Sequence, residues 1–233
     1  GGDGFVVLQD PTDYRVAFSE SQDGNIVRVD RVTGETMSVR PQPGPGEPPL
    51  RWHWDTPLLL SPHDPKVVYA AANKVFRSPD RGLSWVAISA DLTTGQDRDT
   101  LETMGVKGSD IQFSRHDGIQ AWPAIVSLAE SPKRAGLLYA GTDDGSLAVT
   151  RDAGKTWTHI GLADKQVIAK IRVHPTNPDL VYVAAFGHHA AANPDRGVYR
   201  SKDGGKTWDK VLFRDDKTGA IELVLDPNNP QVI

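Results

Sequence analysis

The sequence predicts an all-β protein built from repeated four-stranded units, and three observations lead to this expectation. Short β-prone runs alternate with turns rich in Pro, Gly, Asp and Asn, and no stretch keeps a helical period. The pattern (Ser/Thr)-x-Asp-x-Gly-x-(Ser/Thr)-Trp occurs at residues 78–85, 150–157 and 201–208. A turn containing Pro precedes each copy. Such self-similarity is typical of repeat architectures.

The turns that contain Pro set the period of the repeat. Each lies between two β-prone runs, and successive turns at Pro11, Pro62, Pro132, Pro175 and Pro227 are 51, 70, 43 and 52 residues apart. Four strands recurring at roughly 40–50 residues are typical of a β-propeller blade. We therefore predict a β-propeller of four-stranded antiparallel blades, a fragment of a larger propeller. Its blades are expected at about 1–40, 52–90, 122–161 and 166–213, with the start of a fifth at 219–233.

The third unit shows the four expected strands most clearly, at 124–128, 136–141, 146–150 and 156–160. The first strands of the other units are expected at 5–8, 58–60, 168–173 and 221–225. These first strands are largely apolar, so we expect them to be buried on both faces near the propeller axis. The fifth blade would leave an open strand edge, so more blades or another chain are expected to cover it.

Composition excludes several classes of protein. A chain of 233 residues with 38% hydrophobic and 24% charged residues can build a sizeable core. The absence of Cys excludes disulfides and thiolate metal sites. A net charge of -4 and a pI near 6.0 argue against a nucleic-acid partner. No apolar run reaches the ~18–20 residues of a membrane helix. We expect no cofactor and no metal.

The repeated eight-residue turn is expected to be structural. Its Asp can accept backbone N–H groups, its Gly supplies a positive φ, and its Trp fills the gap between blades. A residue that recurs in every unit is a poor candidate for a unique catalyst. The structural set is Asp80, Gly82, Trp85, Asp152, Gly154, Trp157, Asp203, Gly205 and Trp208.

These turns resemble the Asp boxes of bacterial neuraminidase repeats, which occur in sialidases, xyloglucanase-like glycosidases, sortilin-type receptors and photosystem assembly propellers. Longer stretches, including residues 54–57, 141–145 and 196–201, resemble bacterial sortilin-type propellers often described as glycosyl hydrolases. The resemblance implies the fold, but such propellers host enzymes and binding proteins alike. We expect a secreted, periplasmic or cell-surface location.

Three long segments, 40–55, 89–122 and 186–196, are expected to open on one face of the propeller. Long loops on a rigid scaffold commonly carry function. The candidate ligand-face residues within or beside them are Arg51, Trp52, His53, Trp54, Asp55, Arg115, His116, Asp117, Gln120, Trp122, Asp144, His188 and His189. Asp55, Asp117 and Asp143 are the candidate catalytic carboxylates.

Each candidate also has a structural interpretation. Trp52 and Trp54 beside Asp55 would suit a sugar platform with a general acid or base, or both rings pack beneath the 41–49 loop. His188 and His189 are adjacent, so in an extended segment they point in opposite directions and rarely bind one metal ion. The turn at residues 143–145 has the sequence of a hairpin turn, although it also faces the loop side.

Two functions compete at this stage. The favoured hypothesis is a non-catalytic binding or scaffold propeller that engages a protein or peptide partner through its long-loop face. The alternative is a glycoside hydrolase of sialidase or xyloglucanase-like architecture that acts on a polysaccharide. The absence of a recognisable sialidase arginine triad, and of any spacing that singles out two carboxylates, favours binding over hydrolysis.

Overall fold

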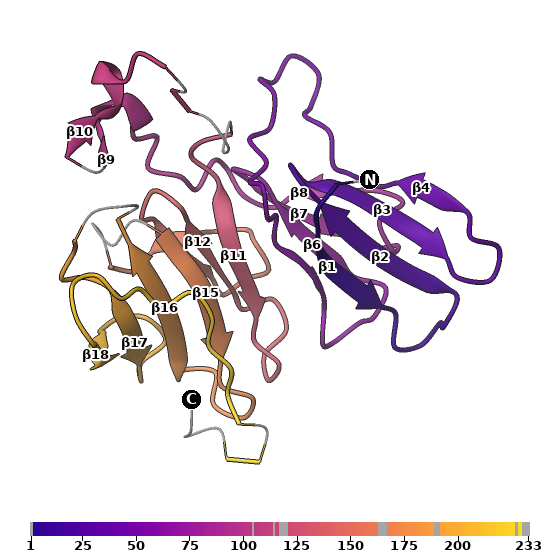
Figure 1. The fold of residues 1–233 in the computed structure, drawn as a ribbon. Helices are drawn as coiled ribbons and strands as arrows, with labels where there is room; N and C mark the ends of the chain where they lie inside the picture. Colours follow the sequence, from indigo (N-terminus) through magenta and orange to yellow (C-terminus); the bar gives the residue numbers. More distant parts are fainter. Residues whose placement is uncertain are drawn as a thin grey trace.

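Four antiparallel four-stranded sheets form the framework of the computed structural model, which describes residues 2–103, 105–113, 115–116, 121–162, 167–188, 192–226 and 228–229. In each sheet the strands follow one another in sequence order. Figure 1 shows the sheets as blades that follow one another around the molecule. The predicted all-β propeller architecture is therefore confirmed.

Sixteen strands form the four blades, and those of blade 3 overlap the four runs expected in the third unit. Blade 1 contains β1 (Gly4–Gln9), β2 (Val16–Ser21), β3 (Asn25–Asp30) and β4 (Thr36–Ser38), and blade 2 contains β5 (Leu58–Leu60), β6 (Val68–Ala71), β7 (Val75–Ser78) and β8 (Val86–Ala87). Blade 3 contains β11 (Ile125–Glu130), β12 (Leu138–Thr142), β13 (Leu147–Thr150) and β14 (Thr158–His159), and blade 4 contains β15 (Val167–Val173), β16 (Val181–Gly187), β17 (Gly197–Ser201) and β18 (Asp209–Leu212).

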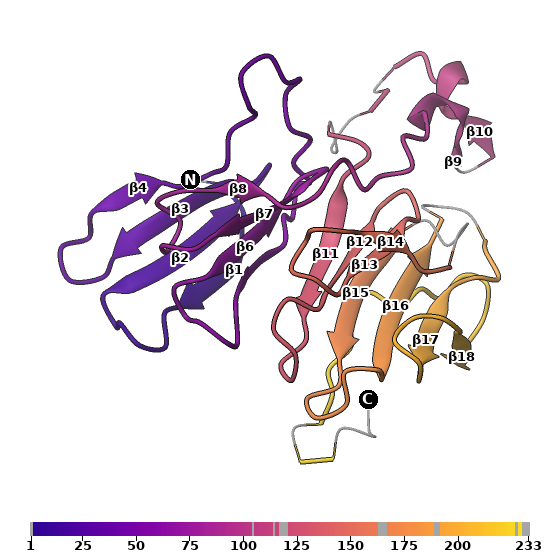
Figure 2. The same ribbon diagram turned by 180° about the vertical axis from the view of Figure 1, so that it is seen from behind.

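The long segments gather at one end of the blades. The segment between blades 1 and 2 and the insertion between blades 2 and 3 both project from that end, as Figure 2 shows. The insertion contains η1 (Arg98–Thr100), the two-stranded sheet of β9 (Glu102–Thr103) and β10 (Val106–Lys107), and η2 (Gly108–Asp110). No helix among the described residues is long and apolar enough to cross a membrane.

The second strand is the most buried strand of blades 1, 2 and 4, and in blade 3 it is fully buried together with β13. All residues of β6 and β12 are buried, and so are all but one of β16. The first strands β1 and β11 alternate between more and less buried positions. The expectation that first strands are buried on both faces is therefore wrong. The second strand has paired neighbours on both edges and packed sheets on its faces, whereas one face of β11 and of β15 lines an open cavity.

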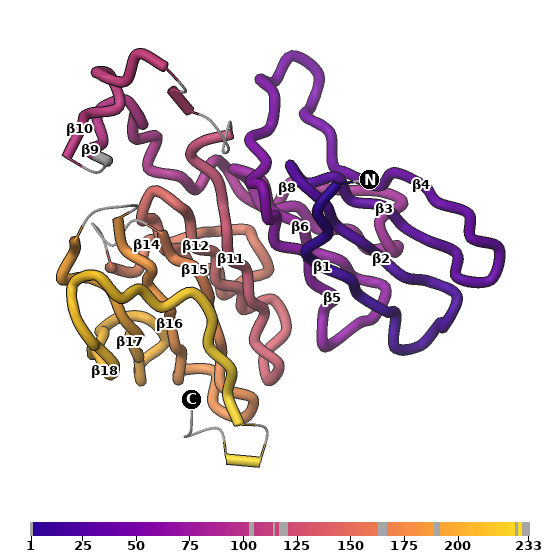
Figure 3. The backbone as a smooth tube through the Cα atoms, viewed as in Figure 1, coloured from indigo at the N-terminus to yellow at the C-terminus, as the bar shows by residue number. Residues whose placement is uncertain are grey.

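The expected first strand of a fifth blade is not a strand in the structure. Residues 219–226 form no strand ladder with the described part of the chain, and a backbone bond to blade 4 runs from the Ala220 N–H to the Ala185 carbonyl at 3.3 Å. Leu223 packs with Tyr182, Ala184 and Val198 of blade 4. The segment therefore covers the face of blade 4 by apolar contact, as the tube in Figure 3 traces, without the ladder that defines a strand. Residues 230–233 lie outside the described residues.

Each Asp box closes around its own carboxylate. In the turn of blade 3, Asp152 Oδ2 accepts the Thr156 hydroxyl at 2.6 Å and Oδ1 accepts the Thr156 N–H at 2.9 Å. The hydroxyl of Thr150 donates to Asp152 and accepts the Gly154 N–H. The same set of bonds surrounds Asp80 and Asp203. The bonds from Thr156 and Thr150 lower the pKa of Asp152 to about 2.

The box also joins its blade to the preceding one. Trp157 Nε1 donates to the Ile88 carbonyl at 2.7 Å, and the backbone of Gly154 packs so closely that an added Cβ would lie 2.7 Å from Ile88 Cβ. Trp208 repeats the bond, donating to the Ile160 carbonyl at 2.7 Å. We call this contact the inter-blade clamp: the Trp and Gly of one Asp box pack on the residue that follows the last strand of the preceding blade.

The clamp between blades 1 and 2 is incomplete. Trp85 packs against the core shared by these blades, and its Nε1 is buried without a partner among the described residues. Gly82 approaches Val39 less closely, at 3.3 Å for an added Cβ. Trp85 therefore contributes packing without the hydrogen bond.

This difference gives a stability prediction. Trp157→Phe loses indole packing and leaves the Ile88 carbonyl without its donor, whereas Trp85→Phe loses only packing. We expect Trp157→Phe to lower the free energy of unfolding by about 1 kcal/mol more than Trp85→Phe. Urea unfolding of both variants measures it, and equal losses would show that the Trp157 hydrogen bond adds nothing.

The Asp boxes also predict an acid response. The folded-state pKa of Asp152 lies below the ~3.9 of an unfolded Asp, so its stabilisation is complete above that pH and is lost as the pH falls toward 2. The Asp152→Asn variant should be less stable than the wild type at pH 6, and the difference should shrink by pH 2.5. Unfolding curves at both pH values test this, and a constant difference would contradict it.

Candidate functional site

A cavity of about 430 Å³ opens on the long-loop face, where the first strands of blades 3 and 4 begin. It is bounded by the segment before β5, the start of β11, the turn after β12, the start of β15, the end of β16 and the 219–226 segment. Its lining residues are His53, Asp55, Trp122, Val126, Asp143, Val167, Ala169, Phe186, Ile221 and Glu222. We call it the mouth cavity. Asp55, Asp143, His53 and Trp122, predicted from distant parts of the sequence, meet there.

Asp143 is a buried carboxyl at the edge of the mouth cavity, with 2% of its surface exposed. Its Oδ1 accepts the Ala124 N–H at 2.8 Å, and its own N–H donates to the Ala124 carbonyl at 3.1 Å. Oδ2 has no hydrogen-bond partner among the described residues. Burial raises the pKa of Asp143 to about 8, and the nearby Asp144 adds to the shift, while the bond from Ala124 and the charge of Arg98 oppose it. Asp143 therefore holds a proton at neutral pH.

Asp55 is an exposed carboxyl of the cavity, on the loop that enters β5. Its N–H donates to His53 Nδ1 at 3.1 Å, and the Thr56 hydroxyl donates to the His53 carbonyl at 2.9 Å. The Thr56 N–H in turn reaches Glu20 Oε1 at 3.3 Å. The tight turn thus fixes the backbone of Asp55 while its carboxylate faces solvent.

Two carboxyls near the cavity were not predicted from the sequence. Glu20, on β2, is 1% exposed, and burial raises its pKa to about 8. Glu222 lines the cavity and forms ion pairs with Lys170 at 2.7 Å and Arg172 at 3.1 Å. The sequence offered one signal for Glu20: a charged residue within a β-prone run, where its side chain can become buried. Glu222 gave none, because its position depends on how the 219–226 segment folds back.

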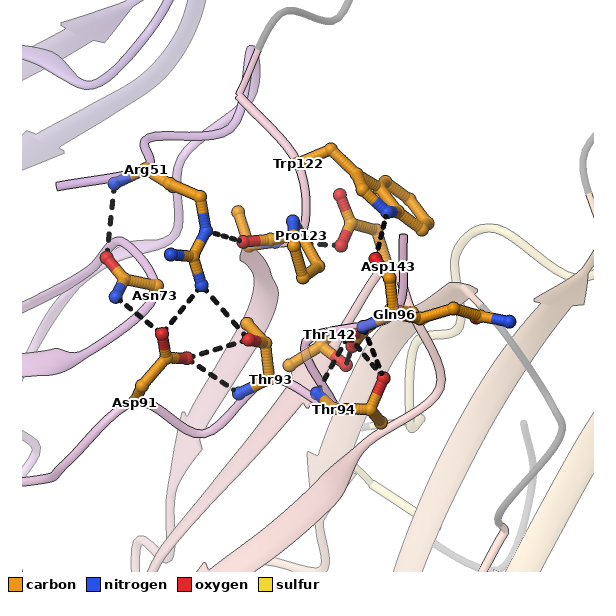
Figure 4. A network of polar contacts seen from close by, with 12 residues as sticks. Arg51, Asn73, Asp91, Thr93, Thr94, Gln96, Trp122, Pro123, Thr142 and Asp143 are labelled. Carbon is orange, nitrogen blue, oxygen red and sulfur yellow. Dashed lines mark hydrogen bonds and ion pairs between the residues drawn. The ribbon is translucent and has the colours of Figure 1, made fainter. Parts of the chain in front are cut away.

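Arg51 and Asp144, both expected on the ligand face, are held by other protein groups. Arg51 binds Asp91 at 2.6 Å through Nη2 and the Pro123 carbonyl at 2.7 Å through Nε. Asp144 accepts both the N–H and the hydroxyl of Thr94 at 2.7 Å. Figure 4 shows the network around Arg51 and Asp91 that ties blade 2 to the start of blade 3. These two residues therefore anchor the first part of the insertion.

Trp122 depends on that anchored segment. Its Nε1 donates to the Gln96 carbonyl at 3.2 Å, and its ring lines the mouth cavity. Figure 4 shows the indole above Gln96, close to Asp143. The contact fixes an aromatic surface beside the buried carboxyl.

The placement of Trp52 on the ligand face is corrected by the structure. Trp52 is 2% exposed, and its ring stacks on Phe76 with centroids 6.1 Å apart. The Arg40 guanidinium covers its ring at 5.2 Å. Trp52 is therefore core between blades 1 and 2, because its indole fills the space beside Gly24. Trp54 is half-buried, and its carbonyl accepts the Asp23 N–H; it does not line the mouth cavity.

Among the remaining candidates, those that the structure describes do not line the mouth cavity. Arg115 and His116 both bind Asp99, at 3.2 Å and 2.6 Å, within the projecting insertion. The His188 carbonyl accepts a bond from Arg196. Asp117, Gln120 and His189 lie outside the described residues. Among the residues that the structure describes, no three His, Asp or Glu side chains are grouped as metal ligands.

The two tryptophans give a matched prediction. Trp52→Ala should lower the free energy of unfolding by about 3–5 kcal/mol, because it empties a core site. Trp122→Ala, at the rim of an open cavity, should cost less than half of that. Urea unfolding of both variants measures the difference. Equal losses would mean that Trp122 is also a core residue.

Comparison with known proteins finds an Asp-box repeat family and several xyloglucanases. The BNR/Asp-box repeat family matches residues 199–210. An oligoxyloglucan-reducing end-specific xyloglucanase of Emericella nidulans is 33% identical over 111 residues, which are 46% of this chain and 14% of that protein. A probable enzyme of the same name from Neosartorya fischeri is 30% identical over 165 residues, which are 69% of this chain and 17% of that protein.

Solved structures show the same fold. The GH74 enzyme of Niastella koreensis superposes with a TM-score of 0.61 at 18% identity, covering 98% of this chain and 32% of that chain. The GH74 xyloglucanase of Xanthomonas campestris gives a TM-score of 0.58 at 20% identity, covering 92% and 31%. The chain is thus an Asp-box repeat β-propeller related to GH74 xyloglucanases, and it spans less than a fifth of the length of the two curated relatives. These similarities do not single out a sortilin-type branch.

The comparison also corrects the functional expectation. We favoured a non-catalytic propeller that engages a protein or peptide partner, and that preference is wrong. The relatives found by sequence are xyloglucanases, which support the alternative of a glycoside hydrolase. The sequence-based argument failed because it required a recognisable spacing between two carboxylates. In the structure, the three carboxyls of the mouth cavity, Asp55, Asp143 and Glu222, come from three separate parts of the chain.

Proposed function

We propose that this propeller belongs to a glycoside hydrolase that acts on a xyloglucan-type polysaccharide. One observation carries the proposal: two carboxyls in unequal environments, Asp55 and Asp143, line a single cavity with the aromatic rings of Trp122 and Phe186. The names of the relatives supply the substrate class.

The two carboxyls divide the work of hydrolysis. Cleavage of a glycosidic bond needs one group that protonates the leaving oxygen and a second that activates water or attacks the sugar. Asp143 is the general acid, because burial keeps it protonated at neutral pH and its buried Oδ2 has no hydrogen-bond partner among the residues that the structure describes. Asp55 is the partner base, because its carboxylate is exposed and its backbone is fixed by the turn with His53.

The rest of the cavity suits a neutral sugar. Trp122 and Phe186 offer aromatic surface for the apolar faces of pyranose rings. The volume of about 430 Å³ lies within the range of ligand-binding cavities. Glu222 is paired with Lys170 and Arg172, so its charge is compensated at the cavity wall. A polysaccharide substrate is met outside the cytoplasm, so we also propose a secreted, periplasmic or cell-surface location.

Substitution of the two carboxyls tests the proposal. Asp143→Asn and Asp55→Asn should each lower the rate of reducing-end release from xyloglucan by about 10²-fold or more in the full protein. Asp110→Asn removes an exposed carboxylate of the insertion that does not line the cavity, and it should leave the rate unchanged. No hydrolysis by the wild type, or rates within about twofold of it in both carboxyl variants, would refute the proposal.

The raised pKa of Asp143 also predicts how the hydrolysis rate and the stability depend on pH. The wild-type rate should fall as the pH rises through about 8, because Asp143 then loses its proton. The folded-state pKa also lies above the unfolded value of ~3.9, so stability decreases as the pH rises from about 4 to 8. Asp143→Asn should remove part of this decrease. Parallel stability profiles for the two proteins would show that Asp143 is ionised in the folded state.

A further inference from the structure

A second cavity, of about 470 Å³, lies between blades 2 and 3 at the end opposite the mouth. The turns between first and second strands and the Asp-box turns of both blades border it. Its walls include Tyr69, Val86 and Ile88 of blade 2, and Glu130 of blade 3 lines it as well. We call it the inter-blade cavity. The proposed hydrolysis does not use it.

Glu130 brings an incompletely paired carboxylate to this cavity. Its Oε1 accepts the Gly136 N–H at 3.0 Å and the Tyr69 hydroxyl at 3.3 Å. Its Oε2 is buried and has no hydrogen-bond partner in the described part of the chain. Burial and the adjacent Glu130 charge raise the pKa of Tyr69 to about 12, so this hydroxyl stays a donor. A buried carboxylate oxygen without a donor is costly, so a cationic donor in the cavity would be stabilising.

The neighbouring intervals between blades show what fills the equivalent space. Between blades 1 and 2, Arg81 extends from its Asp box to the buried carboxylate of Asp10 at 2.6 Å. Burial acts to raise the pKa of Asp10, but the hydrogen bonds from Arg81, Thr12 and Asp13 together outweigh it and lower that pKa to about 2. Between blades 3 and 4, Arg151 donates to the Gly204 carbonyl at 2.6 Å. A guanidinium therefore crosses each of these two intervals.

The interval between blades 2 and 3 lacks both arginines. The position of Arg81 in the Asp box is taken by Ala153 in blade 3, and the position of Arg151 is taken by Pro79 in blade 2. Both short residues line the inter-blade cavity. Arg77 also lines the cavity and bonds the Tyr69 hydroxyl, but Glu130 Oε2 has no hydrogen-bond partner among the described residues. The cavity is thus the space that an arginine occupies elsewhere in the repeat.

We propose that the inter-blade cavity binds an aliphatic guanidinium, the chemistry of an arginine side chain presented by another molecule. Glu130 is its carboxylate partner, and Tyr69, Val86 and Ile88 surround its alkyl chain. The site is independent of the mouth cavity, because it lies at the other end of the blades and shares no lining residue with it.

Calorimetric titration with n-butylguanidinium chloride tests this site directly. The wild-type protein should bind one molecule, and Glu130→Gln should weaken binding about tenfold or more, because it removes the charge but keeps an acceptor for Gly136. Glu35→Gln, which removes an exposed carboxylate on blade 1, should leave the affinity within about twofold. Butyrate and n-butanol should bind at least tenfold more weakly than the guanidinium.

A second variant keeps the test decisive if Glu130→Gln does not fold. Ala153 and Arg81 share the left-handed backbone conformation, with φ near 60° in both, so Ala153→Arg is accommodated and supplies the missing guanidinium from within the chain. This variant should fold and lose n-butylguanidinium binding. Unchanged binding in Ala153→Arg or in folded Glu130→Gln, equal binding of n-butanol, or no binding by the wild type would overturn the proposal.

Discussion

The contact on which this structure depends is the one between an Asp box and the blade before it. Trp157 and Trp208 each donate to a carbonyl just beyond the last strand of the preceding blade, and the adjacent glycine lets the two backbones approach. The Asp carboxylate holds the turn in the shape that aims the indole. A small turn within one blade thereby fixes the spacing between two blades, and this spacing sets the distances across the axis.

Because the Asp-box turns fix the blades at one end, the long loops at the opposite end can form the mouth cavity. Asp55 enters from the loop before blade 2, and Asp143 from a turn within blade 3, so neither blade alone makes the mouth cavity. The long insertion contributes indirectly, since the bonds of Arg51 and Asp144 anchor the segment that positions Trp122. The same modular construction produces the inter-blade cavity, where two short residues replace arginines of the repeat.

The sequence predicted the features that repeat and missed those that depend on one place in the fold. The period of the Pro turns and Asp boxes located all four blades, because each unit carries its own turn chemistry. Burial of Trp52, by contrast, depends on Phe76 and Gly24 of two different blades. Asp143 has the sequence of an ordinary hairpin turn, and its raised pKa comes from burial that no local pattern encodes. Residues 221–225 have the sequence of a strand but do not pair with any strand among the described residues.

The central claim is that Asp143 carries a proton at neutral pH inside the mouth cavity, and a carbon NMR titration of Asp carboxyl groups tests it most directly. Assignment by comparison with the Asp143→Asn protein would identify its resonance. The account predicts that this carboxyl titrates near pH 8, far above the other Asp residues. A midpoint near pH 4 would contradict it, because an ionised Asp143 could not serve as the acid for glycosidic cleavage.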